Sequence, residues 1–256
     1  MRGFLYLLGF LMITTVAFAG HPLATDDAGT SGKGKGQVEI GVSFFEDKDD
    51  ADEAITMKAK GGEIAIGFAV GVLEMMDVVM GVPYVWYFVD ENGVRVEKAN
   101  GLSDISFDVK WCLFEKDGWV LALKPGVSLP SGDEDNGLGA GRADWRIFFI
   151  GTKEFEPAAL HVNVGCLRNE NKTDERLNLW HASLAAEVEV VRRLKLMANI
   201  CVERSPEKGS DNHPSFALGG ISYDVSERVT IDAGVKIGLT DPADDVAYLT
   251  GITVKF

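Results

Sequence analysis

The stretch VTIDAGVKIGL, residues 229–239, alternates apolar and polar side chains along its whole length. Its apolar members are Val229, Ile231, Ala233, Val235, Ile237 and Leu239, and polar residues or glycine fill the positions between them. On an α-helix these apolar residues would spread around the whole circumference, whereas on a β-strand they share one face. The stretch therefore predicts a strand with one apolar and one polar face.

The same period of two recurs along the chain, for example from Asp104 to Leu113. Segments of this kind, bounded by turn-forming residues, are typical of an all-β protein. We predict twelve strands, at residues 37–45, 62–72, 78–88, 103–114, 119–129, 142–151, 158–167, 177–188, 194–203, 214–223, 229–239 and 246–256. Gly219 and Gly220 interrupt the alternation in the tenth strand and predict a bulge or bend there.

The connections between these strands alternate in length. Connections after the even-numbered strands are short, at residues 73–77, 115–118, 152–157, 189–193 and 224–228. Most of the others are longer and more polar, as at 46–61, 89–102, 130–141 and 204–213, while 240–245 is compact. Short periplasmic turns and longer extracellular loops are typical of bacterial outer-membrane barrels. The fold class we predict is thus a transmembrane antiparallel β-barrel of about twelve strands, with both termini at the periplasmic end.

Alternation alone does not say whether the apolar faces meet lipid or a water-excluded core. Aromatic residues gather near the predicted strand ends, and rings at both membrane interfaces are typical of barrels. These residues are Phe44, Tyr84, Trp86 and Phe88 near the loops, and Trp111, Phe114, Trp119, Tyr223 and Phe256 near the turns. The opposite faces also carry many charges. We therefore expect the apolar faces to contact outer-membrane lipid and the loops to contact lipopolysaccharide.

The start of the chain has the form of a secretory signal. Arg2 is followed by an uncharged apolar run from Gly3 to Val16 and then by the small-x-small sequence Ala17-Phe18-Ala19. A membrane-spanning helix needs roughly 20 apolar residues, so the run is short for an anchor. We expect a signal peptide at 1–19, a periplasmic N-terminal segment at 20–36 and the barrel at 37–256.

Charge and cysteine content exclude several function classes. The formal net charge is −14, which is unsuited to binding the phosphates of nucleic acid. The cysteines are Cys112, Cys166 and Cys201, and their wide spacing includes no CxxC pair for zinc and no CxxCH motif for haem. The sequence predicts neither a cofactor nor a metal site.

The last residues of the chain resemble the terminal-strand signal of outer-membrane barrels. Phe256 ends the sequence, and Val254, Ile252 and Tyr248 share its face of the predicted strand. In such barrels this pattern is read by the barrel-assembly machinery, so the resemblance implies that machinery as a partner.

Other segments resemble a family of outer-membrane β-barrels regarded as transporters of the phenol-degradation meta-pathway. The resemblance covers HPLATDDAGT at 21–30, GKGQVE at 34–39, GLSD at 101–104 and KPGVSLPSG at 124–132, and so touches most of the barrel. It implies a channel-like barrel in the outer membrane and supplies no catalytic residues. The pathway name is a weak guide to the solute.

Two features suggest other chemistry. His181 and Ser183 lie two residues apart on one strand face, but a hydrolase also needs a group that orients the histidine, and none is close in sequence. The acidic run at 46–53 offers carboxylates for Ca²⁺ but lacks the spacing of an EF-hand loop. A polar lumen network and a hydrated surface loop are the simpler interpretations.

The predicted inner face is the best functional lead, because buried charges must be paired or hydrated. Its lumen-lining candidates are Glu39, Glu63, Asp104, Asp108, Lys110, Lys124, Asp144, Arg146, His161, His181, Glu187, Lys195, Glu203, Asp232 and Lys236. We predict an outer-membrane channel or transporter-like barrel for a small solute, such as an aromatic compound or an organic acid. The alternatives are a closed structural or surface-binding barrel and, third, an outer-membrane hydrolase.

Overall fold

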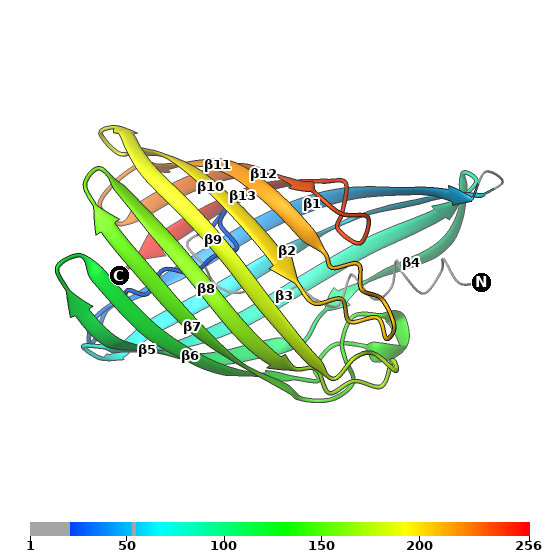
Figure 1. The fold of residues 1–256 in the computed structure, drawn as a ribbon, viewed down its shortest axis with the longest axis horizontal. Helices are drawn as coiled ribbons and strands as arrows, with labels where there is room; N and C mark the ends of the chain where they lie inside the picture. The colour runs from blue at the N-terminus through cyan, green and yellow to red at the C-terminus, as the bar shows by residue number, and fades with distance from the viewer. Residues whose placement is uncertain (1–20, 53–54) are drawn as a thin grey trace.

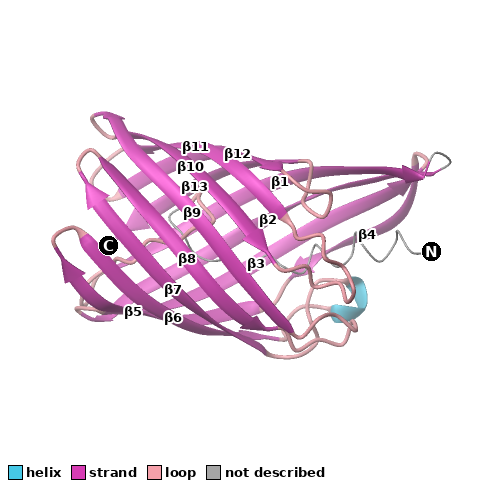
Figure 2. Cartoon of the chain, viewed as in Figure 1, coloured by secondary structure: helices cyan, strands magenta, loops and turns pink. Residues whose placement is uncertain are grey.

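The computed structural model describes residues 21–52 and 55–256, which form a closed antiparallel β-barrel (Figure 1, Figure 2). The strands are β1 (Gly36–Asp52), β2 (Ile55–Leu73), β3 (Met76–Glu91), β4 (Val94–Leu102), β5 (Ile105–Lys116), β6 (Trp119–Leu129), β7 (Asp144–Phe155), β8 (Ala158–Arg168), β9 (Asn178–Val191), β10 (Leu194–Glu203), β11 (Ser215–Asp224), β12 (Val229–Gly238) and β13 (Val246–Lys255). Within the described residues, no helix is long and apolar enough to cross a membrane. The predicted signal peptide at 1–19 lies outside this part of the chain.

The ring has twelve positions, although the sheet contains 13 strands. β3 pairs with β4 through residues 84–91 and with β5 through residues 76–81, so β4 and β5 share one position. The pairings of β1 with β13 and of β2 with β3 complete the ring. The predicted twelve-stranded barrel is confirmed.

Two predicted loops are strands instead. Residues 46–61 continue the β1–β2 hairpin on both sides of its tip, and β4 occupies most of 89–102. Figure 1 shows these strands extending past the rest of the barrel at the end opposite the C-terminus. Both segments alternate, as at Met57 and Ala59 and at Val94 and Val96, but the charged residues between these positions give them the composition of polar loops. A hairpin satisfies its own backbone hydrogen bonds and can therefore continue through polar sequence.

The outer surface of the barrel is apolar. In β12, Val235 and Ile237 are 39% and 55% exposed, while Asp232 is 6% exposed and faces the interior. A water-soluble barrel would have the reverse arrangement. Because closed strands satisfy their own hydrogen bonds, a barrel can present apolar side chains to hydrocarbon. The apolar outer surface contacts membrane lipid.

The aromatic residues expected at the two membrane interfaces lie on the outer surface. Of these residues, only Trp86 is not classed as exposed. Its ring packs edge-on against Phe44, with 5.6 Å between the ring centroids. The partial burial of Trp86 therefore comes from a contact on the outer surface and does not mean that the ring points into the lumen.

Phe256 lies where the first and last strands meet. Its amide donates to the carbonyl of Gly36 at 2.9 Å, and the Gly36 amide donates to the Phe256 carbonyl at 3.0 Å. The Phe256 ring is exposed. Backbone bonds therefore complete this end of the β1–β13 seam, while the Phe256 ring stays exposed.

We expect Phe256→Asp to reduce the amount of assembled barrel severalfold in cells, measured as heat-modifiable folded protein. The substitution keeps both backbone hydrogen bonds, each of which is worth about 0.5–1.5 kcal/mol. A large defect would therefore reflect recognition of the ring during assembly. Lys255→Ala, at an exposed neighbour, is the control. Equal amounts of folded Phe256→Asp and wild-type protein would contradict the assembly signal.

Candidate functional site in the barrel lumen

Residues 21–31, here called the lumen segment, lie inside the barrel. The sequence prediction places residues 20–36 in the periplasm, outside the strands, but the lumen segment contacts the inner face of the barrel wall. Figure 1 shows it in dark blue within the half of the barrel nearer the C-terminus. The prediction follows from the absence of alternation, which says nothing about where an irregular segment docks.

The strongest contact of the lumen segment is a shared carboxylate. Asp26 Oδ1 accepts a hydrogen bond from Lys110 Nζ at 2.8 Å, and Asp26 Oδ2 accepts one from Lys124 Nζ at 2.7 Å. The three side chains are 1%, 9% and 3% exposed. Asp27 adds a weaker ion pair, 3.9 Å from Lys110 Nζ. These charges are compensated where water is largely excluded, so losing one partner would be costly.

The sheet itself explains why Asp26 is needed. The β5–β6 register pairs Asp108 with Gly126 and Trp111 with Leu123, which places Lys110 opposite Lys124. Like charges directly across an antiparallel pair destabilise it. A carboxylate between the two ammonium groups turns this repulsion into two charge-assisted hydrogen bonds.

Amide and hydroxyl groups anchor the backbone of the lumen segment. Asn199 Oδ1 accepts hydrogen bonds from the amides of Ala24 at 2.7 Å and Thr25 at 3.1 Å. The amide of Ala28 donates to Thr152 Oγ1 at 2.9 Å. Irregular backbone inside a barrel needs such partners, since it has no strand neighbours to bond. Here the wall side chains supply them.

His161 contacts Thr152, one of these anchoring residues. Its Nδ1 lies 2.9 Å from Thr152 Oγ1, and both side chains are buried. His161 therefore acts on the lumen segment through Thr152. Sequence analysis identifies His161 as a lumen candidate but not this role.

The wall is shaped to receive the start of the lumen segment. A Cβ atom at Gly41 would lie 2.7 Å from the His21 ring, and one at Gly251 would lie 2.5 Å from it. A Cβ at Gly220 would lie 2.8 Å from Pro22. Glycine at these wall positions allows the close approach.

His21 is held by two acids of the predicted inner face. Its amide donates to Glu39 Oε1 at 3.1 Å, and its Nδ1 lies 2.5 Å from Asp232 Oδ1. Both acids are buried. These two lumen candidates thus contact the lumen segment.

Apolar contacts complete the docking. Leu23 packs in a buried cluster with Ala185, Met197 and Leu218. Ala28 is fully buried in a second cluster that includes Phe148. The lumen segment is therefore packed as part of the interior.

A second ion-pair network lies beside Asp26. Arg146 donates from Nε to Asp108 Oδ1 at 3.0 Å and from a terminal nitrogen to Oδ2 at 2.9 Å, and it also bonds Ser128 at 2.8 Å. Asp144 lies 3.9 Å from Arg146. A Cβ at Gly126 would clash with Asp108 Oδ1 at 1.9 Å, so glycine makes space for this network.

Asp104 belongs to the mouth and not to this network. Its carboxylate accepts hydrogen bonds from the amides of Gly132 and Ala140, each at 2.8 Å. It thereby fixes the loop between β6 and β7. Glu134 lies in the same loop and accepts a hydrogen bond from Lys172, which belongs to the loop between β8 and β9. This bond lowers the pKa of the Glu134 carboxyl.

Two further basic lumen candidates form ion pairs with acids outside the lumen segment. Lys195 pairs with Glu187 at 2.7 Å, and Lys236 pairs with Asp244 at 2.9 Å. Glu63 is buried on β2. The structure thus separates the candidates that hold the lumen segment from Glu187, Lys195 and Lys236, which form ion pairs elsewhere.

His181 lies in a separate cluster on β9 and β10. Its Nε2 is 2.9 Å from Ser183 Oγ, and its Nδ1 is 2.7 Å from Glu203 Oε1. The expectation that no group orients His181 is wrong, because the strand register pairs Glu203 with His181. A partner brought close by register is distant in sequence. Ser183 is nevertheless buried, with 6% exposure.

Sequence reasoning missed Asp26 altogether. One signal was available in the sequence: Lys110 and Lys124 lie on adjacent predicted strands, and no acid was predicted to pair with both. An unpaired buried ammonium requires a partner. That requirement could have pointed to an acid outside the strands.

Comparisons with known proteins agree with this architecture. Residues 19–256 match the sequence profile of a family described as "Putative MetA-pathway of phenol degradation". The fold is similar to the COG4313 outer membrane channel from Pseudomonas putida F1, with a TM-score of 0.66, 10% identity and coverage of 86% of this chain and 95% of that one. It is also similar to the KdgM porin (TM-score 0.55, 7% identity, 86% and 99% covered). The translocator domain of the autotransporter NalP from Neisseria meningitidis is a third similar fold (TM-score 0.57, 10% identity, 88% and 89% covered). No curated protein matches the sequence.

Proposed function

The chain belongs to the family of the MetA pathway of phenol degradation, and from that premise we propose that it is a channel for small organic acids, closed at rest by its lumen segment. The predicted family resemblance is confirmed, as are the barrel fold and the bacterial outer-membrane location. The solute and the gating are the proposal.

One observation carries the proposal: the carboxylate of Asp26 occupies a site made by Lys110 and Lys124. When the lumen segment leaves, two ammonium groups on adjacent strands lose their shared anion. A carboxylate from a small solute supplies the same charge and the same two hydrogen-bond acceptors. An organic acid thus competes with Asp26, which favours this class over a neutral aromatic compound.

The backbone contacts of the lumen segment suit a reversible closure. Its backbone is held mainly by side-chain hydrogen bonds, for example from Ala24 and Ala28 to Asn199 and Thr152. Water can replace such bonds at modest net cost, since each is worth about 0.5–1.5 kcal/mol. No strand has to separate for the lumen segment to move.

Conductance in planar lipid bilayers tests the proposal. We expect low conductance for the wild type and a severalfold larger open fraction for Asp26→Asn, because the neutral amide holds the two lysines less strongly. Benzoate, used as a probe acid, should raise the open fraction of the wild type, whereas benzyl alcohol should not. Asp27→Asn, whose carboxylate is 3.9 Å from Lys110, is the matched control and should behave nearly as the wild type.

If neither variant conducts, the barrel is closed and structural, which is the second candidate function. If Asp26→Asn conducts but benzoate has no effect, the lumen segment is a gate and the proposed solute class is wrong. An outer-membrane hydrolase, the third candidate, requires ester hydrolysis that disappears in Ser183→Ala. The burial of Ser183 argues against this third candidate.

A further inference from the structure

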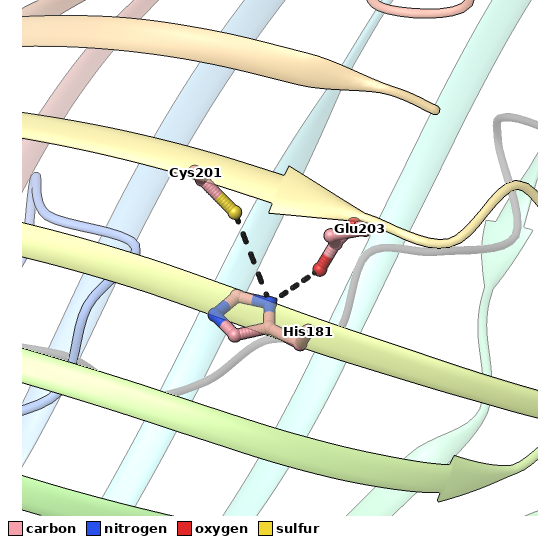
Figure 3. Close-up of side chains that lie close together, drawn as sticks. All are labelled: His181, Cys201 and Glu203. Atoms are coloured by element: carbon pink, nitrogen blue, oxygen red, sulfur yellow. Dashed lines mark hydrogen bonds and ion pairs between the residues drawn. The ribbon is translucent and has the colours of Figure 1, made fainter. Parts of the chain in front are cut away.

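Three potential metal ligands of different chemistry meet on the inner wall at β9 and β10. We call His181, Cys201 and Glu203 the His181 cluster; Figure 3 shows their side chains converging. His181 Nδ1 lies 2.7 Å from Glu203 Oε1 and 3.8 Å from Cys201 Sγ. All three ligand atoms lie within 4.8 Å of one another. One nitrogen, one sulfur and one oxygen thus face a common point.

This spacing fits a tetrahedral Zn²⁺ site. Typical Zn–S and Zn–N bonds place the two ligand atoms about 3.6 Å apart in a tetrahedron, and Zn–N and Zn–O bonds place them about 3.4 Å apart. The sulfur–nitrogen distance of 3.8 Å is already close to the first value. The nitrogen–oxygen pair, at 2.7 Å, must open by a fraction of an ångström as the hydrogen bond is exchanged for metal ligation.

Ser183 gives the histidine the support that metal ligands usually have. In the metal-binding tautomer, His181 Nε2–H donates to Ser183 Oγ, which lies 2.9 Å away. Such a bond fixes the ring and leaves Nδ1 free to bind the metal. The edge of the Phe148 ring also packs against His181, with 5.3 Å between the ring centroids.

The charges of the cluster also match the metal. A Cys201 thiolate and a Glu203 carboxylate together neutralise Zn²⁺, so the loaded site is neutral in a poorly hydrated wall. Binding releases the thiol proton of Cys201 to solvent. The Glu203 side chain is 15% exposed, so one of the three ligands is accessible to an ion from solvent.

We propose that His181, Cys201 and Glu203 bind Zn²⁺ at the barrel wall, with a fourth position open to water. The alternative use of these residues is a Ser183–His181–Glu203 hydrolytic triad. A triad has no need for a thiol beside the nitrogen that faces its acid, yet Cys201 Sγ lies 3.8 Å from that nitrogen. The position of Cys201 therefore favours the metal.

The test uses the full mature barrel without a histidine tag, folded in detergent and treated with a chelator. Co²⁺ serves as a spectroscopic probe for Zn²⁺, because a bound thiolate gives a sulfur-to-cobalt charge-transfer absorption. We expect this absorption in the wild type and in the double variant Cys112→Ser/Cys166→Ser, which leaves Cys201 as the remaining thiol. Stoichiometric Zn²⁺ should abolish it by displacing Co²⁺.

Site variants then assign the ligands. Cys201→Ser should lose the absorption, whereas Cys112→Ser, which removes an equally buried thiol, should keep it. Ser183→Ala should weaken Zn²⁺ binding by about tenfold, as removal of a group that orients a metal-bound histidine typically does. If Cys201→Ser does not fold, Glu203→Gln provides the second variant and should weaken Zn²⁺ binding more than Ser183→Ala does.

The absence of charge-transfer absorption in the folded wild type would overturn the proposal. So would an absorption that persists in Cys201→Ser or disappears in the double variant. Labelling of Ser183 by a fluorophosphonate, with no Co²⁺ signal, would favour the triad instead. None of these outcomes depends on channel conductance, so this proposal and the proposed channel function can fail separately.

Discussion

Asp26→Ala is expected to release the lumen segment from the barrel wall. If the segment stayed docked, Lys110 and Lys124 would be left as neighbouring buried charges without their shared carboxylate. Removing one partner of a buried ion pair costs about 3–5 kcal/mol. At about 1.4 kcal/mol for each factor of ten, the ratio of docked to released lumen segment should fall by about a hundredfold to several thousandfold.

Hydrogen exchange of the purified barrel in lipid nanodiscs measures this release. The amides of Ala24, Thr25 and Ala28, which are bonded to wall side chains, should lose their protection, while strand amides keep theirs. Adding Lys110→Met and Lys124→Met to Asp26→Ala should restore protection, because the two lysine charges that need Asp26 are then removed as well. Asp27→Ala is the control. Full protection in Asp26→Ala would mean that the ion pairs do not hold the lumen segment.

Val235→Arg is expected to destabilise the folded barrel by about 2–4 kcal/mol, the cost of arginine near the midplane of a bilayer. Val235 lies in the middle of β12 and faces outward, paired with Gly219 on one side and Tyr248 on the other. The charged group would replace an apolar contact with lipid chains. Urea unfolding in phospholipid vesicles gives the free energy of unfolding.

Val235→Leu, which keeps an apolar side chain, should unfold at nearly the wild-type urea concentration. The difference between the two variants isolates the effect of charge from that of size. If Val235→Arg were as stable as Val235→Leu in vesicles, this part of β12 would not contact the hydrocarbon region.

The local pattern of the sequence predicted most of the barrel. The stretch at 229–239 alternates with a period of two, and β12 covers Val229–Gly238. A strand's side-chain period is fixed by its own backbone geometry, so the two faces of a strand can be assigned from its own sequence. Aromatic residues near the strand ends further indicated that the apolar faces meet lipid.

The missed strands, β4 and the outer parts of β1 and β2, do alternate, as at Ile55, Met57 and Ala59. The runs are short and the positions between them are charged, for example Lys58 and Lys60, so their composition resembles that of a polar loop. Their hydrogen bonds come from pairing with β3 or with each other. Strand pairing depends on two segments and cannot be predicted from either segment alone.

By itself, the sequence determined most of the strands, their two faces and the membrane as their environment, because these follow from residues close together in the chain. Only the tertiary structure decided that Asp26 joins Lys110 and Lys124, which are 84 and 98 residues away. It also decided that Glu203 faces His181, through the register of β9 and β10. The physical reason is that closing the ring brings distant inner faces together in a confined space, where each buried charge must find a partner that no local pattern specifies.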